Sequence, residues 1–376
     1  VQKAIDKAKL LADVVIGLGH LGVDPSSSPW TSEEVIAHTS GFDAFIDGHS
    51  HTVMENKQVQ DASGKAVTLT QTGSYFANVG EMTIAADGTI TTKLIPTHEG
   101  MDAGIAAMQT SWVNTVDDML GEKIAVGDSD FYVSDPATGK RRIRSAETNL
   151  GDFVADGIYT YFNEVEKLHC DVAIMNGGGI RADVPAGDWT FKTCKQISPF
   201  GNVACLMSVT GKQIQDALEF AARFAGEDGK ENGGFLQVAG ATYEIHTDIP
   251  NTVQTDDKNV WIGSATGTPR VQNVKIYDRA NGTYVPLDES KTYALAGMNY
   301  TLRNLGDGFA MFDGAELIKD YVSEDYLVMS TYAMIFDGAD AAGLPHLASA
   351  NSPLAAYPGY LLNYEQPYGA GRITIL

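Results

Sequence analysis

The first fifty residues contain two short apolar segments, each followed by a Gly-His step, with an amphipathic segment between them. Residues 13–19 and residues 42–47 are apolar runs, typical of strands buried on both faces. Between them, Thr31 and Glu34 have the spacing of a capping box, and Gly41 follows the apolar positions, so we predict a helix between residues 31 and 41. This order of elements predicts a βαβ unit, which folds around a parallel sheet.

Three histidines follow the two predicted strands: His20 after the first, and His49 and His51 after the second. Ligands gather at the carboxyl ends of strands in open α/β sheets, and neutral imidazole is the commonest metal ligand. The alternate spacing of His49 and His51 would let them face two metals, or one metal from two sides. A strand cap or a surface position explains a single histidine well, but three at strand ends favour a metal site.

The rest of the chain divides into a hairpin, a helix and a longer mixed region. We expect strands at 82–85 and 90–94 joined at Asp87-Gly88, and a connecting helix over 101–119. Beyond it, the sequence predicts helices and strands that do not alternate strictly, which is typical of an α+β domain. The expected elements are helices at 149–165 and from the capping box at 210–213 through 224, strands at 171–175, 238–246, 271–277 and 293–297, and an irregular insertion near 338–359.

Composition excludes several classes of protein and partner. The 376 residues carry 26 Lys and Arg against 48 Asp and Glu, a formal net charge of −22, which argues against a nucleic-acid polymer or an anionic membrane surface as partner. No apolar run approaches the roughly 20 residues of a membrane-spanning helix. The three cysteines lack C-x-x-C spacing, so we expect buried free thiols and no disulfide framework.

A glycine-rich loop and an arginine run suggest recognition of an anion. Asn176 to Arg181 reads Asn-Gly-Gly-Gly-Ile-Arg directly after a predicted strand, so main-chain N–H groups and a planar guanidinium lie close together in sequence. Taken alone, such a loop is more often only a turn. Arg141, Arg142 and Arg144 are the densest positive run, and we interpret Arg141 and Arg142 as part of a solvated hairpin.

Gly-His followed by Gly-His-Ser-His resembles the last two motifs of the calcineurin-like metallophosphoesterases, in the branch of the 5′-nucleotidases and UDP-sugar hydrolases. The resemblance implies that His20 and His49 bind one divalent ion and His51 a second, of the zinc or manganese class. Two such ions about 3.5–4 Å apart would polarise the phosphoryl oxygens and supply a hydroxide nucleophile.

The second half resembles the C-terminal domain of the same family in its substrate loops. Pro199–Asn202 is similar to the loop that carries one face of an aromatic base sandwich, and residues 299–309 to the loop that carries the other face and a ribose-binding aspartate. The family usually places that aromatic six residues before the aspartate, whereas Tyr300 precedes Asp307 by seven. The substrate-binding residues that the resemblance implies are Arg144, Asn176, Arg181, Phe200, Gly233, Tyr300 and Asp307.

The resemblance implies a fold and a domain order. We expect an α/β remnant of a four-layer metallophosphoesterase sandwich at 1–98, a linker helix at 99–120, and an α+β 5′-nucleotidase C-terminal domain at 121–376. The Asp-x-His, Gly-Asp and Gly-Asn-His motifs that open the phosphoesterase domain do not stand before Asp13, and no Gly-Asn-His occurs anywhere, so no catalytic residue is assigned. We expect the chain by itself to be catalytically incomplete, with a metal site that need not be occupied. We expect its partners to include the missing N-terminal part of the same protein.

The implied function is metal-dependent hydrolysis of nucleotide phosphate esters, in an extracellular, cell-surface or periplasmic protein that takes part in nucleotide catabolism. Several alternatives stay open. The chain could be a non-catalytic nucleoside- or nucleotide-binding module, or a relative of the UDP-sugar hydrolases or cyclic-nucleotide phosphodiesterases. A relative that acts on a sulfur ester is a further alternative, and the predicted base sandwich around Phe200 argues against it.

Overall fold

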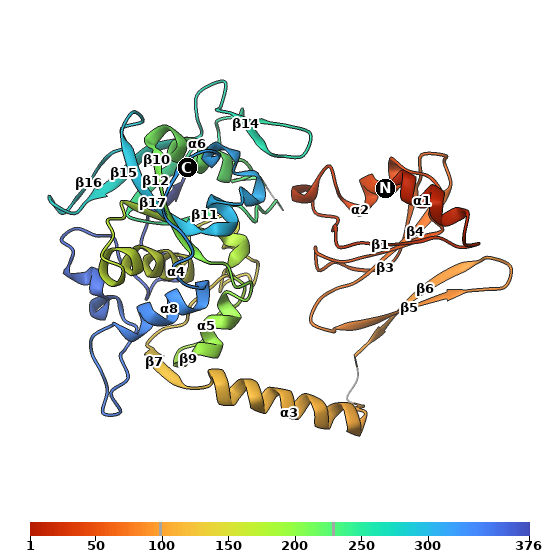
Figure 1. The fold of residues 1–376 in the computed structure, drawn as a ribbon, viewed down its shortest axis with the longest axis horizontal. Coiled ribbons are helices and arrows are strands. Elements are labelled where there is room, and N and C mark those ends of the chain that lie inside the picture. The colour runs from red at the N-terminus through yellow and green to blue at the C-terminus, as the bar shows by residue number, and fades with distance from the viewer. Residues whose placement is uncertain (98–99, 228–229) are drawn as a thin grey trace. The chain divides into compact units, whose positions relative to one another are not determined.

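The computed structural model describes residues 1–97, 100–227 and 230–376, which form two compact units (Figure 1). The first unit comprises residues 1–106 with 257–259, and the second comprises residues 107–256 with 260–376. The three-part division at 98 and 120 stays a prediction, and its first boundary falls on residues outside those described.

The first unit contains the predicted βαβ arrangement. Its sheet has the order β1-β2-β4-β3, in which β1, β2 and β4 are parallel and β3 is antiparallel to β4. The Thr31 side chain accepts from the Glu34 N–H and the Glu34 carboxylate accepts from the Thr31 N–H, so the capping box is confirmed. The elements are α1 (Gln2–Lys9), β1 (Ile16–Leu18), α2 (Ser32–Ala37), β2 (Ala44–Asp47), β3 (Val53–Gln60) and β4 (Ala66–Thr72).

Two further predicted elements form close to their expected positions. The hairpin is confirmed as β5 (Asn78–Ile84) paired with β6 (Ile90–Pro96), with Gly88 in the turn at a φ of 83°. The helix expected over 101–119 is α3 (Ala103–Leu120), and none of its residues is buried. Within the described ranges, no helix is both long enough and apolar enough to cross a membrane.

The second unit is built around a mixed sheet of order β11-β8-β17-β10-β18. The sequence of strand β8 is apolar because both faces of the strand are buried. Ala173 and Met175 pack into a core with α4 and α8, whereas Val172 and Ile174 pack into a second core with α6. The bounds are α4 (Asn149–Thr160), β8 (Val172–Asn176), β10 (Ala204–Thr210), α6 (Gly211–Ala221), β11 (Leu236–Ala239), β17 (Thr292–Met298), β18 (Glu316–Lys319) and α8 (Asp325–Met334).

A second sheet of order β16-β15-β12-β19 packs in the same unit. The single strand expected over 238–246 is wrong, because Gly240 (φ 71°) separates β11 from β12. A side chain there would start 2.4 Å from the Asp171 carbonyl oxygen, so only glycine lets the chain pass between the sheets. The remaining elements are β7 (Lys123–Gly127), β9 (Gly187–Thr190), α5 (Phe191–Ile197), β12 (Ala241–Ile245), β13 (Gln254–Thr255), β14 (Trp261–Gly263), β15 (Val271–Asp278), β16 (Thr283–Pro286), α7 (Asn299–Leu302) and β19 (Ile373–Ile375).

The structure of the second unit tests several smaller predictions about helix ends, cysteines and the stretch 338–359. The helix expected over 149–165 ends as α4 at Thr160 and continues as a π-helical turn to Val165, and the helix expected through 224 ends as α6 at Ala221. The three cysteines are buried free thiols, as expected. The stretch 338–359 contains short 3₁₀ turns and no strand or α-helix.

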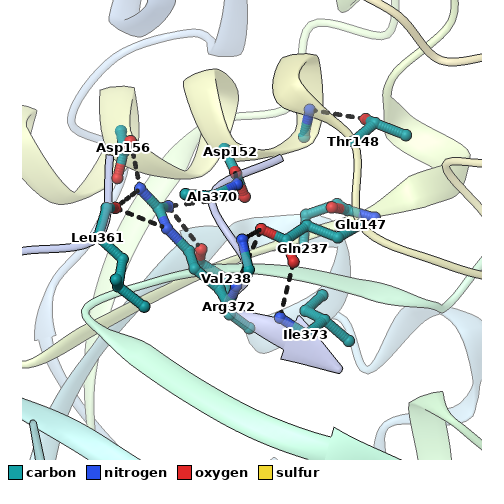
Figure 2. A network of polar contacts seen from close by, with 12 residues as sticks. Glu147, Thr148, Asp152, Asp156, Gln237, Val238, Leu361, Ala370, Arg372 and Ile373 are labelled. Atoms are coloured by element: carbon teal, nitrogen blue, oxygen red, sulfur yellow. Dashed lines mark hydrogen bonds and ion pairs between the residues drawn. The ribbon is translucent and has the colours of Figure 1, made fainter. Parts of the chain in front are cut away.

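A buried guanidinium joins the closing segment of the chain to α4 (Figure 2). Arg372 is fully buried and donates to Asp156 at 2.7 Å and to the Val238 and Leu361 carbonyls at 2.9 and 2.7 Å. Asp152 lies 3.8 Å away, and burial raises the pKa of its carboxyl well above the usual value. The positive charge of Arg372 compensates the buried Asp156 carboxylate, which is 0% exposed.

The same network holds the segment that carries Arg144. The Glu147 carboxylate accepts from the main-chain N–H groups of Gly371, Arg372 and Ile373, at 2.9, 3.0 and 2.7 Å (Figure 2). The Gln237 amide donates to the carbonyls on either side of Arg144, those of residues 143 and 146. Residues 143–147 are thus held in place by bonds to two distant strands.

Candidate functional site

The Asp307 carboxylate joins two other predicted site residues. The Asn176 amide donates to Asp307 Oδ2 at 3.1 Å, and the Tyr300 hydroxyl donates to Asp307 Oδ1 at 2.9 Å. Asn176 ends β8, Tyr300 lies on α7, and Asp307 lies in the loop that follows α7. The structure thus brings three predicted residues from two distant segments into direct contact.

The glycine-rich loop and the Gly233 loop approach each other at main-chain distance. The Gly178 N–H donates to the Gly233 carbonyl at 2.7 Å. A Cβ on Gly177 would lie 2.3 Å from the Ile143 carbonyl oxygen, and one on Gly234 would lie 3.1 Å from Asp307 Cβ. Gly177 is therefore required, because a side chain there would overlap the Ile143 main chain, and a side chain at Gly234 would need its neighbours to shift.

Arg144 lies beside these loops with an unsatisfied polar group. Its carbonyl accepts from the Asn232 N–H at 3.1 Å, and its buried Nε has no hydrogen-bond partner among the described residues. Burial, together with repulsion from Arg141 and Arg181, lowers the pKa of the Arg144 guanidinium to about 10. A half-buried cation with an unused donor is suited to binding an anion.

Phe200 has a large, exposed aromatic ring that forms a cation–π contact with an arginine. It is 59% exposed, and the Arg181 guanidinium carbon lies 5.7 Å from the ring centre. The Arg181 main-chain N–H donates to the Ile197 carbonyl at 2.9 Å, which brings the glycine-rich loop to the end of α5. Such a cation–π contact orients the ring while one face stays available.

The loop that carries Phe200 is tied directly to α7, which carries Tyr300. The Val203 N–H donates to the Asn299 side chain at 2.9 Å, and the Asn299 N–H donates to the Val203 carbonyl at 2.8 Å. Tyr300 is 37% exposed. This pair of bonds fixes the spacing of the two segments that present exposed aromatic rings.

Three residues that support the site were missed or only partly understood from the sequence. The predicted hairpin forms, with an antiparallel bridge between Ser134 and Arg141, but its arginines are half-buried and not fully solvated. Arg141 forms an ion pair of 2.5 Å with Glu231, and Arg142 Nε donates to the Glu147 carbonyl at 2.8 Å. Asp325 is 2% exposed and accepts from the Asn202 N–H at 3.1 Å, next to Phe200. Burial raises the pKa of Asp325 to about 6. Its sequence signal is only that of an acid in the first turn of a helix.

The predicted metal-binding histidines lie in the first unit. The His20 and His49 rings meet edge to face with centres 5.1 Å apart, whereas the His51 ring packs 6.1 Å from that of Tyr75. Within residues 1–97, 100–227 and 230–376, no three His, Cys, Asp or Glu side chains form a group that could bind a metal ion. By themselves, these residues do not fit a complete divalent-metal site, and their role as ligands stays a prediction.

Comparison with known proteins identifies the family. Residues 125–314, half of the chain, match the model of the 5′-nucleotidase C-terminal domain. The chain belongs to the 5′-nucleotidase C-terminal domain family. It is 30% identical over 328 residues to a trifunctional nucleotide phosphoesterase of Bacillus subtilis, covering 84% of this chain, and 25% identical over 361 residues to a rat 5′-nucleotidase, covering 88%.

A solved structure supports the fold of this 5′-nucleotidase family member. A 5′-nucleotidase precursor from Thermus thermophilus matches the whole chain with a TM-score of 0.66 at 23% identity. The expected fold class is therefore confirmed as a mixed α/β 5′-nucleotidase fold. The chain spans 20% of the Bacillus protein, 58% of the rat enzyme and 66% of the Thermus chain.

Proposed function

We propose that the second unit binds nucleosides and nucleotides, and that the whole protein hydrolyses nucleotide phosphate esters. The observation that carries this proposal is the convergence of three kinds of group in one place. The site combines exposed aromatic rings for a flat base, a carboxylate with amide and glycine neighbours for a sugar, and a half-buried arginine with an unused donor for a phosphate.

Each predicted residue takes a role that its chemistry suits. Phe200 and Tyr300 stack on the base, and stacking on an aromatic ring contributes on the order of 1–3 kcal/mol per base. Asp307 and Asn176 bind the ribose beside Gly233, while Arg144 and Arg181 bind the phosphate side. The site suits a nucleoside monophosphate and also the nucleotide half of a UDP-sugar.

Hydrolysis is proposed only for the whole protein. His20, His49 and His51 would supply neutral ligands to divalent ions of the zinc or manganese class, and the other ligands would come from groups outside this sequence. When bound, such ions supply Lewis-acid polarisation and an activated water. We place the protein outside the cytoplasm, at the cell surface, in the periplasm or secreted, because members of this family act there.

Replacing Phe200 with alanine should weaken adenosine binding by about 5- to 140-fold, because the variant loses one stacking face. Isothermal titration calorimetry of the 376-residue chain measures this directly. The matched control is Phe76→Ala in the first unit, where Phe76 is 89% exposed, and we expect it to leave the affinity unchanged. Equal affinity in the parent and in Phe200→Ala would exclude stacking.

A second candidate function, binding without catalysis, is favoured by the histidine geometry. Because the described residues contain no group of three metal ligands, we expect the purified chain to turn over AMP near background with excess Mn²⁺ or Zn²⁺ while it still binds adenosine. Mass spectrometry should first exclude a co-purifying fragment. Robust turnover by the chain alone would show that these histidines suffice for a catalytic metal site.

A further inference from the structure

We propose that the Tyr300 hydroxyl positions Asp307 for recognition of the sugar, so that Tyr300 sets the preference of the site for nucleosides with 2′ and 3′ hydroxyls. This inference rests on the proposed function and deepens it. It gives Tyr300 a role beyond stacking, and that role depends on a single oxygen atom.

The hydrogen bonds to Asp307 orient its carboxylate and leave each oxygen able to accept a further hydrogen bond. Asp307 Oδ1 accepts from Tyr300 at 2.9 Å and Oδ2 accepts from Asn176 at 3.1 Å. A carboxylate has about four lone-pair sites, so each oxygen can accept one further bond from a sugar hydroxyl. Two donors on opposite oxygens also fix the plane of the carboxylate, which a single donor cannot do.

The direction of the Tyr300 bond is set by its surroundings. Burial, followed by the charge of Asp307, raises the pKa of the Tyr300 phenol above its usual value. The phenol therefore keeps its proton near neutral pH and donates it to the carboxylate. A phenylalanine would leave this position on Asp307 without a donor.

The backbone between the two residues also indicates a constrained loop. Leu305 and Asp307 have φ values of 55° and 54°, a left-handed conformation that residues with a Cβ rarely adopt. Gly306 lies between them, and a Cβ there would lie 2.5 Å from Tyr300 Cζ, so the ring rests on the Gly306 backbone. Such conformations persist where surrounding contacts hold them, and here the Tyr300 ring and hydroxyl supply those contacts.

The seven-residue separation of Tyr300 and Asp307 is part of this arrangement. The chain bends through the two left-handed residues, and the bend returns Asp307 to the hydroxyl of the ring. The ring contact and the hydroxyl bond are therefore separable. Tyr300→Phe keeps the ring over Gly306 and removes only the bond to Asp307.

The test compares adenosine with 2′,3′-dideoxyadenosine by calorimetry on the 376-residue chain. The parent should prefer adenosine. Tyr300→Phe should weaken adenosine binding on the order of tenfold, the effect of one hydrogen bond to a charged group, and change dideoxyadenosine binding less than about twofold. The matched control is Tyr132→Phe, which removes a phenol-to-Asp130 bond of the same 2.9 Å length elsewhere. It should change neither affinity.

A second variant makes the result independent of how well Tyr300→Phe folds. Asp307→Asn should produce the same selective loss, and adding Tyr300→Phe to it should have no further effect, because the two residues act through one bond. An unchanged preference in Tyr300→Phe, or equal loss for both ligands, would overturn the positioning role alone. A parent chain that binds neither nucleoside would overturn the proposed function and this inference with it.

Discussion

Arg372→Met is expected to lower the free energy of unfolding by about 3–5 kcal/mol, because it leaves buried carboxylates without a compensating charge. Asp156 loses its 2.7 Å partner, and the Val238 and Leu361 carbonyls lose their donors. Chemical denaturation followed by tryptophan fluorescence measures the change. The lost bonds also hold the closing segment, whose main-chain N–H groups donate to Glu147 in the segment that carries Arg144, so AMP affinity should fall while the chain is still folded.

A surface pair provides the control for this experiment. Arg303 forms a 2.7 Å ion pair with Asp320, and its side chain is 41% exposed. Arg303→Met should cost only about 0–1 kcal/mol, because solvent screens exposed ion pairs. If Arg372→Met were no more destabilising than Arg303→Met, the buried network of Figure 2 would not be what holds the closing segment.

Arg144→Met is expected to have opposite effects on binding and on stability. AMP affinity should fall about 100-fold through the loss of charge-assisted bonds to phosphate, with adenosine affinity within about twofold of the parent. Without ligand, the variant should be more stable by about 1–3 kcal/mol, because a half-buried cation with an unpartnered Nε is removed. Calorimetry and denaturation on the same samples measure both quantities.

The comparison of the two ligands is the control for that variant. Adenosine shares the base and ribose of AMP and lacks only the phosphate, so a change confined to AMP assigns Arg144 to the phosphate. Equal losses for both ligands, accompanied by lower stability, would instead show that Arg144 supports the loops of the site.

Features that depend on residues only a few positions apart could be predicted from the sequence. The capping box at Thr31 and Glu34 and the hairpin around Gly88 each depend on residues at most a few positions apart. The two strand segments before the histidines and the helix at 101–119 were also predictable from their apolar spacing, although α3 buries none of its residues and β1 buries only Gly17. The loops that carry the predicted substrate-binding residues were recognisable because their motifs are contiguous.

Contacts between distant segments were decided only by the tertiary structure. Arg141 pairs with Glu231 across 90 positions and Asn176 with Asp307 across 131, and nothing local indicates either partner. Gly240 divides one apolar run between two sheets, which a hydrophobicity pattern cannot distinguish from a continuous strand. The chemistry of the site was therefore encoded in short motifs, whereas the pairing of Tyr300 with Asp307 and the burial of Arg372 depend on which strands and loops become neighbours on folding.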